Sequence, residues 1–196
     1  MGIRPSIVAI GGTASDQSST GHALRTALDS AERLGARVVM FGGAQLRSLP
    51  HYMTPGCMGN DTARALVDAV READGLIIAS PGYHGSISGL VKNAIDYLEE
   101  TAKDSRVYLD GVPVGLIATA YGWQAASHTL GTLRTIVHSL RGWPTPLGAA
   151  VNSSSGLFKD GVCQDKAVEA QLHLIGKQVF EFARREADVT RGTQAA

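Results

Sequence analysis

Five short apolar segments alternate with amphipathic helical segments along this chain, and the alternation is the feature that most restricts its fold. The apolar segments are residues 7–10, 38–41, 76–79, 112–118 and 147–151. Helical spacing of apolar residues covers 23–34, 60–72, 90–98, 124–140 and 165–185. Strands that are apolar throughout are typical of parallel sheets buried on both faces. The sequence therefore predicts an α/β fold: a doubly wound, five-stranded parallel sheet covered by helices on both sides.

The length of 196 residues suits five such strand–helix units in one domain. No repeat or low-complexity linker divides the chain, so we expect a single domain over residues 1–186. Residues 187–196 have little apolar surface to bury, and we expect them to form a disordered tail. The alternation does not give the order of the strands, so a flavodoxin-like order and a dinucleotide-fold order both stay open at this point.

Charge and cysteine content exclude several classes of protein. Eighteen Lys and Arg residues balance eighteen Asp and Glu residues, so we expect no nucleic acid and no membrane as partners. No apolar run approaches the ~18 residues of a membrane span. Cys57 and Cys163 are too few for a disulfide framework and have no neighbouring zinc ligands, which favours a cytoplasmic location and no metal site.

The loop after the first apolar segment is rich in hydroxyl groups. In doubly wound sheets ligands bind beyond the carboxyl ends of the strands, where this loop lies. It also precedes a helix, whose unpaired N–H groups can hold a phosphate without any Lys or Arg. The alternative is that one hydroxyl of Ser18, Ser19 or Thr20 only caps the helix. The loop has neither the spacing of a nucleoside triphosphate loop nor that of a classical dinucleotide loop.

The loop after the third segment, residues 80–88, combines stiff, planar and glycine residues. Pro81 restricts the turn, Tyr83 and His84 are planar, and Gly85 lets backbone approach a flat ligand. The Gly-x-Ser-x-Gly spacing of a hydrolase nucleophile is absent, so we expect no nucleophilic serine. His84 has no partner at ligand spacing, which favours a positioning role over metal binding.

These two loops resemble those of the NAD(P)H-dependent FMN reductases, a family of the flavodoxin-like superfamily. The first loop places Thr13, Ser15, Ser18 and Thr20 as in Gly-Ser-x-Arg-x-x-Ser-x-Asn. The more specific likeness is the run 81–96, whose sequence is PGYHGSISGLVKNAID. The likeness spans about residues 7–185. It implies a flavodoxin-like fold with strand order 2-1-3-4-5.

The resemblance also implies where FMN would bind. Its phosphate would lie in the loop 12–20, and its isoalloxazine ring between residues 81–86 and 119–123. The cofactor-binding residues implied are Gly12, Thr13, Ser15, Ser18, Ser19, Thr20, Pro81, Gly82, Tyr83, His84, Gly85, Ser86, Thr119, Tyr121 and Gly122. Three features depart from the family pattern: Ser15 replaces the usual Arg, Asp16 adds a negative charge, and Gly82 removes a side chain beside the ring.

The activity implied is that of an FMN oxidoreductase. NADPH or NADH would pass hydride to FMN, and a flavin, quinone or similar small acceptor would take the electrons. The chemistry would belong to the cofactor, so no side chain is expected to be catalytic. The resemblance also implies a homodimer or homotetramer, and a flavin-dependent monooxygenase as a partner. Within the motif, Lys92, Asn93 and Asp96 are expected to cap, form ion pairs or contact a subunit.

Two other functions stay open. One is a flavodoxin-type electron-transfer protein without nicotinamide turnover, although such carriers are usually acidic and this chain is neutral. The other is a flavin-binding module that acts by recognising a partner, with little turnover. The sequence does not distinguish NADPH from NADH.

Overall fold

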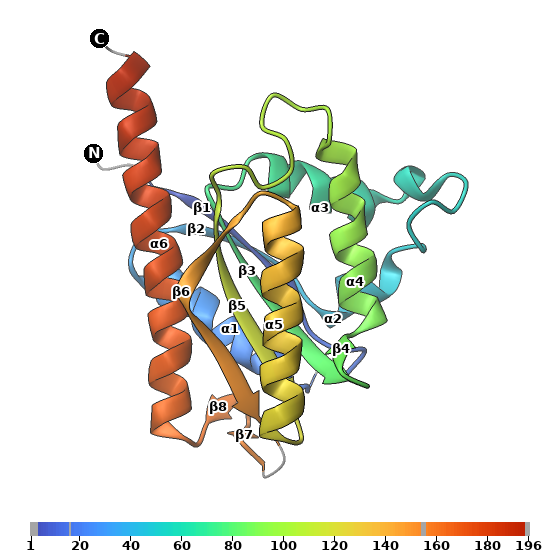
Figure 1. Ribbon diagram of the computed structural model, residues 1–196, viewed down its shortest axis with the longest axis vertical. Coiled ribbons are helices and arrows are strands. Elements are labelled where there is room, and N and C mark those ends of the chain that lie inside the picture. The colour runs from blue at the N-terminus through green and yellow to red at the C-terminus, as the bar shows by residue number, and fades with distance from the viewer. Residues whose placement is uncertain (1–3, 16, 154–155, 195–196) are drawn as a thin grey trace.

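The main sheet contains five long parallel strands in the order β2-β1-β3-β5-β6 (Figure 1). The computed structural model describes residues 4–15, 17–153 and 156–194, with the backbone alone for 187–194. The order confirms the flavodoxin-like arrangement 2-1-3-4-5 expected from the resemblance. The long strands are β1 (Ser6–Gly11), β2 (Arg37–Phe41), β3 (Gly75–Tyr83), β5 (Pro113–Ala120) and β6 (Trp143–Asn152).

Helices cover the two faces of this sheet. They are α1 (Ser19–Arg33), α2 (Gly43–Ser48), α3 (Asp61–Arg71), α4 (Gly89–Asp96), α5 (Trp123–Ser139) and α6 (Lys166–Gln194), with short 3₁₀ helices at Cys57–Gly59 and Tyr97–Thr101. On β1, Ile7 and Ala9 belong to the core shared with α1 and α6, whereas Val8 and Ile10 belong to the core shared with α3, α4 and α5. All four are fully buried. Burial on both faces explains why the strands show no polar alternation.

The third strand is longer than the sequence predicted. Residues 80–88 were expected to form a loop, but β3 continues to Tyr83 and turns into the antiparallel strand β4 (Ser86–Ile87). Pro81 is tolerated here because β1 ends at Gly11 opposite Ala79, so Pro81 pairs with β5 alone. Strand β4 makes the sheet six-stranded instead of five-stranded.

Three further elements were not expected. Helix α2 follows β2 directly, and a small hairpin of β7 (Phe158–Lys159) and β8 (Val162–Cys163) precedes α6. Helix α6 runs to Gln194, so it includes most of the segment 187–196 that was expected to be a tail; no proline interrupts the helical pattern there. Asp16, one of the departures named above, lies outside the described residues. Within the described parts, none of the helices has the length and apolar character needed to span a membrane.

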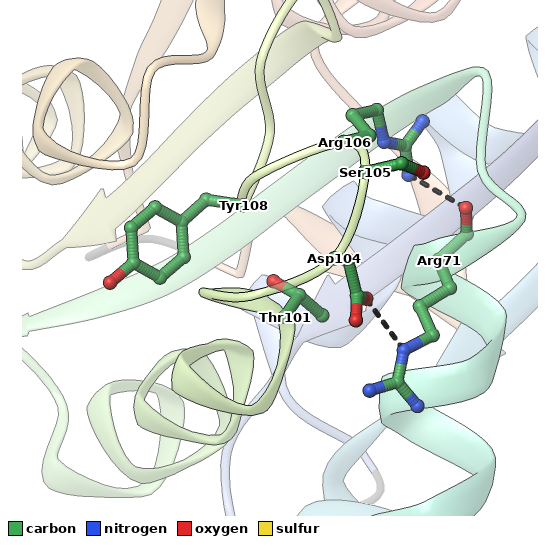
Figure 2. Close-up of a pocket in the computed structure, with 6 residues that line it drawn as sticks. All are labelled: Arg71, Thr101, Asp104, Ser105, Arg106 and Tyr108. Carbon is green, nitrogen blue, oxygen red and sulfur yellow. Dashed lines mark hydrogen bonds and ion pairs between the residues drawn. The ribbon is translucent and has the colours of Figure 1, made fainter.

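Two arginines shape a cavity of about 300 Å³ where α3 ends, at the amino ends of the strands (Figure 2). Arg106 donates to the carbonyl of Ala73 (2.6 Å) and to the carbonyls of Val70 and Arg71 (2.9 Å for Arg71). Carbonyls at a helix end have no partner within the helix. Burial of the guanidinium lowers the pKa of Arg106. Arg106 is therefore the C-terminal cap of α3.

We expect Arg106→Met to lower the free energy of unfolding by about 2–3 kcal/mol, because it removes a charged donor from several buried carbonyls. Urea denaturation measures this loss. Arg71→Met is the matched control: the Arg71 side chain is 40% exposed and pairs with Asp104 and Asp68, so its loss should cost less than about 1 kcal/mol. Equal losses for the two variants would contradict the capping role.

Candidate functional site

A cavity of about 710 Å³ opens at the carboxyl ends of the strands. Its walls come from the segments that follow β1, β3, β5 and β6. The lining residues are Thr13, Ser15, Gln17, Ser18, Ser19, Thr20, Pro81, Gly82, Tyr83, Thr119, Ala120, Tyr121, Gly122, Gln124, Ala125 and Ser153. None of these sixteen residues carries a charged side chain. The structure thus brings the first-loop hydroxyls together with residues 81–83 and 119–122, as the placement of the loops required.

The first wall is the loop that leads into α1. Ser18 is the N-cap of this helix, and its Oγ accepts the N–H of Gly21 at 3.1 Å. Ser18 therefore caps α1, and it also lines the cavity. The amides of Ser19 and Thr20, at the first two helical positions, have no acceptor within the helix. Thr13 Oγ1 accepts the N–H of Ser15 at 3.1 Å, so the Thr13 hydroxyl stabilises the loop itself.

A buried hydroxyl pair joins the first wall to the third wall, which is the segment 119–122 at the end of β5. Thr20 Oγ1 lies 2.6 Å from Thr119 Oγ1, and the two residues are 2% and 3% exposed. They come from the first turn of α1 and the end of β5. In a buried setting such a hydrogen bond fixes the distance between the two elements, because separating them would leave both hydroxyls unpaired. This hydrogen bond therefore fixes the separation of α1 and β5 beside the cavity.

The second wall is the hairpin of β3 and β4. His84 and Gly85 form its two-residue turn with φ values of 51° and 83°, as the hairpin turn that matches strand twist requires. Ser80 Oγ accepts the N–H of Ser88 at 3.0 Å at the base of the hairpin. Ser88 in turn caps α4 by accepting the N–H of Val91. Ser80 and Ser88 therefore have structural roles at the base of the hairpin and the start of α4.

Gly82 lines the cavity and is also required by close packing against α5. A Cβ at this position would lie 2.5 Å from Thr129 Oγ1 and 3.3 Å from the carbonyl oxygen of Ala125. Both atoms belong to α5. The missing side chain therefore lets α5 approach the hairpin, and the sequence interpretation that Gly82 removes a side chain beside a bound ring misses this contact.

Aromatic side chains stand exposed around the cavity. Tyr83 is 53% exposed, Tyr121 is 86% exposed and Trp123 is 62% exposed. Tyr83 and Tyr121 line the cavity, and Trp123 opens α5 immediately after the N-cap Gly122. Three large aromatic groups facing solvent at one cavity are typical of a surface that a flat ligand covers.

Four of the expected binding residues do not line the cavity: Gly12, His84, Gly85 and Ser86. Gly12 packs under the first loop, where a Cβ would lie 3.1 Å from the backbone nitrogen of Gly43. The lining residues that the sequence analysis did not name are Gln17, Ala120, Gln124, Ala125 and Ser153. Ser153 directly follows the last strand of the sheet, so its position at the same edge was the signal that could have identified it.

The later part of the motif, in α4, holds the segment that follows α2. Asn93 donates from Nδ2 to the carbonyl of Pro50 (2.9 Å) and accepts the N–H of Tyr52 (2.8 Å). Lys92 forms an ion pair with Asp96 one turn along α4. These contacts agree with a structural role for all three motif residues. Among the described residues, no group of three His, Cys, Asp or Glu side chains could hold a metal ion.

A family model described as NADPH-dependent FMN reductase matches residues 5–156. The chain belongs to this family. The match includes every residue that lines the cavity and ends before the β7–β8 hairpin and α6. The resemblance stated from the two loops is thereby confirmed.

Individual relatives agree with membership of the NADPH-dependent FMN reductase family. An FMN-dependent NADPH-azoreductase of Staphylococcus saprophyticus is 41% identical over 126 residues, which is 62% of each chain. The Staphylococcus aureus (strain USA300) protein of the same description is 40% identical over 120 residues, which is 60% of each. The alignments thus cover only about three fifths of these relatives.

Solved structures share the fold. The apo form of NADH:FMN oxidoreductase EmoB superposes with a TM-score of 0.65 at 26% identity, over 91% of this chain and 88% of that one. FerB, a flavoenzyme NAD(P)H:(acceptor) oxidoreductase from Paracoccus denitrificans, gives 0.72 at 18% identity, over 92% and 98%. At 18% identity, the FerB superposition shows a shared fold alone.

The cavity fits FMN in size and chemistry. Its volume lies within the range of about 300–1,000 Å³ that small-molecule and cofactor sites occupy. Hydroxyls and helix amides at one wall suit a phosphate, since a helix N-terminus attracts anions. The hairpin and the exposed aromatic residues at the other walls suit a planar ring.

The buried hydroxyl pair yields a stability prediction. Thr119→Val leaves the Thr20 hydroxyl buried without its partner, so we expect a loss of about 1–2 kcal/mol in the free energy of unfolding by urea. The double variant Thr20→Val/Thr119→Val leaves no unpaired hydroxyl and should lose less than the sum of the two single variants. Strictly additive losses would show that the two hydroxyls do not interact.

Proposed function

We propose that this chain is an NADPH-dependent FMN oxidoreductase that passes electrons to a flavin, quinone or similar small aromatic acceptor. One observation carries the proposal: a cavity whose described lining residues are all uncharged joins a helix N-terminus, a hairpin and exposed aromatic side chains in a chain of the NADPH-dependent FMN reductase family. Bound FMN would supply the redox chemistry, accepting hydride from the nicotinamide and releasing electrons to the acceptor.

The first wall would hold the phosphate. The N–H groups of Ser19 and Thr20 point out of the helix start, where the helix dipole adds roughly half a positive charge. The hydroxyls of Ser15, Ser18 and Ser19 lie in the same wall and can donate to phosphate oxygens. The hydroxyl pair of Thr20 and Thr119 keeps this wall at a fixed distance from the wall that would face the ring.

The second and third walls would hold the ring. Pro81, Gly82 and Tyr83 form one side, and the segment 119–122 forms the other. Tyr121 and Trp123 stand open to solvent, so we propose that the nicotinamide and the acceptor reach the cavity past these two side chains.

NADPH is the donor that we propose, because both the family description and the azoreductase relatives name it. The relatives' acceptor class, an azo compound, is planar and aromatic, which suits the exposed aromatic residues. A flavodoxin-type carrier would need a charged docking patch, and the net charge of zero does not favour one. A flavin-dependent monooxygenase that receives the reduced flavin stays a prediction.

We also propose a homodimer or homotetramer in the cytoplasm. A groove between α4 and α5, about 380 Å³ in volume, is lined in part by Ile95, Ile136 and Leu140. Its apolar residues suit a subunit contact. Two buried free cysteines, Cys57 and Cys163, suit a reducing compartment.

The visible spectrum of the purified protein tests the proposed function. We expect yellow protein, or colourless protein that becomes yellow with added FMN. Under anaerobic conditions NADPH should bleach the colour within the time of mixing, and NADH should do so more slowly. The control is a matched solution of free FMN, which the nucleotides should bleach far more slowly.

Other outcomes would decide against the proposal. Bound FMN that neither nucleotide bleaches would assign the carrier function. Protein that retains no flavin at any concentration would refute both functions.

A further inference from the structure

Gly82 lies where the hairpin wall of the cavity meets the start of α5. A Cβ at this position would be 2.5 Å from Thr129 Oγ1, 3.3 Å from the carbonyl oxygen of Ala125 and 3.4 Å from the Cβ of Ala120. Ala125 and Thr129 are one turn apart in α5, and Ala120 ends β5. A side chain at residue 82 would therefore press on the two elements that the third wall connects.

The contact at Gly82 has little freedom to relax. Thr129 is fully buried, and its Oγ1 is attached directly to a branched Cβ, whose rotation in a helix is restricted. The same hydroxyl donates a long hydrogen bond of 3.5 Å to the carbonyl oxygen of Ser86 in β4. Gly82 itself lies in β3 with a φ outside the left-handed region, so alanine at this position is opposed by packing alone.

This contact sets the distance between two sides of the cavity. Residues 81–83 line it from the hairpin, and Gln124 and Ala125 line it from the first turn of α5. Gly82 and Ala125 thus belong both to the cavity lining and to the close contact. Protein interiors are packed too closely to take up an added methyl group without movement. An outward movement of α5 would widen the cavity between these two sets of residues.

We propose that the Gly82–Thr129 contact sets the width of the ring site: it keeps the start of α5 close enough to the hairpin for one flat flavin ring to touch both sides. The contact thereby selects a flat, fused-ring ligand, with or without a phosphate. This proposal rests on the proposed function, because it takes the flavin ring to lie between residues 81–83 and 119–122. Gly82 and Thr129 are positioning residues and take no part in electron transfer.

Paired titrations with FMN and riboflavin test the proposal, because riboflavin lacks only the phosphate. Binding of each flavin to the full chain, freed of any bound flavin, is followed by the quenching of flavin fluorescence. For Gly82→Ala we expect the Kd for both flavins to rise by the same factor, about tenfold, since a widened site loses contact with the ring that the two flavins share. The visible circular dichroism of the bound flavin, which reports the surroundings of its ring, should change as well.

A second substitution separates movement of α5 from direct obstruction of the cavity by the new methyl group. Thr129→Ala removes the nearest atom, so Gly82→Ala/Thr129→Ala should recover Kd values within about twofold of the unaltered protein, together with its circular dichroism. A methyl group that blocked the ring itself would keep its effect in this double variant. Gly131→Ala is the matched control, because it adds a methyl group to α5 at a position where, among the described residues, a Cβ meets nothing within 4 Å outside its own helix. Its Kd values should equal those of the unaltered protein.

The variant Thr129→Ala alone keeps the test decisive if Gly82→Ala does not fold. It leaves a gap beside Gly82 and a less firmly held α5, so both Kd values should rise, and adding Gly82→Ala should lower them again by filling the gap.

Three results would overturn the proposal. One is a Kd for FMN that rises in Gly82→Ala while the Kd for riboflavin does not, because the effect would then lie at the phosphate. The second is unchanged binding of both flavins in Gly82→Ala. The third is a double variant that binds no better than Thr129→Ala. Failure of the unaltered protein to bind either flavin would instead refute the proposed function.

Discussion

Burial of both faces of one parallel sheet is the constraint on which the rest of this structure depends. Helices cover both faces of the sheet and its long strands run parallel, so the strands are joined by crossover connections and all their carboxyl ends meet at one edge. The chain moves from β1 to β2 on one side and to β3 on the other, so the loops after β1 and β3 diverge. That point of divergence is where doubly wound folds open a crevice. The cavity lies there, and no single loop forms it alone.

The cavity is built from neutral groups that close packing brings together. Gly82 lets α5 approach the hairpin, Gly43 lets α2 touch the first loop, and the Thr20–Thr119 hydrogen bond joins two walls. Under the proposed function, amides and hydroxyls of the described lining would recognise the phosphate. The described lining residues would therefore present a bound ring with no ionised side chain.

The arginine contacts at the end of α3 and the proposed binding cavity lie at opposite edges of the sheet. At the amino edge, Arg106 donates to carbonyls at the end of α3, and its neighbour Arg71 pairs with acidic residues. The residues around the cavity in Figure 2 therefore stabilise the contact between α3 and the segment 101–108. At the carboxyl edge, hydroxyls, helix amides and exposed aromatic residues face an open cavity. A change at the amino edge can therefore alter folding with little effect on the proposed flavin site.

The sequence by itself determined the layers, the five long strands and the two loops that meet at the site, because apolar periodicity and loop chemistry are local properties of the chain. It also indicated the hydroxyl groups of the first loop and the family. Only the tertiary structure decided where the expected site residues lie: Ser18 caps α1 and Gly82 packs against α5 while both line the cavity, and Gly12, His84, Gly85 and Ser86 lie outside the cavity lining. The contact of Arg47 with the Ala14 carbonyl could not be assigned from sequence, since it joins two segments that are distant along the chain. Contacts between distant segments depend on packing, and packing leaves no periodic signal in the chain.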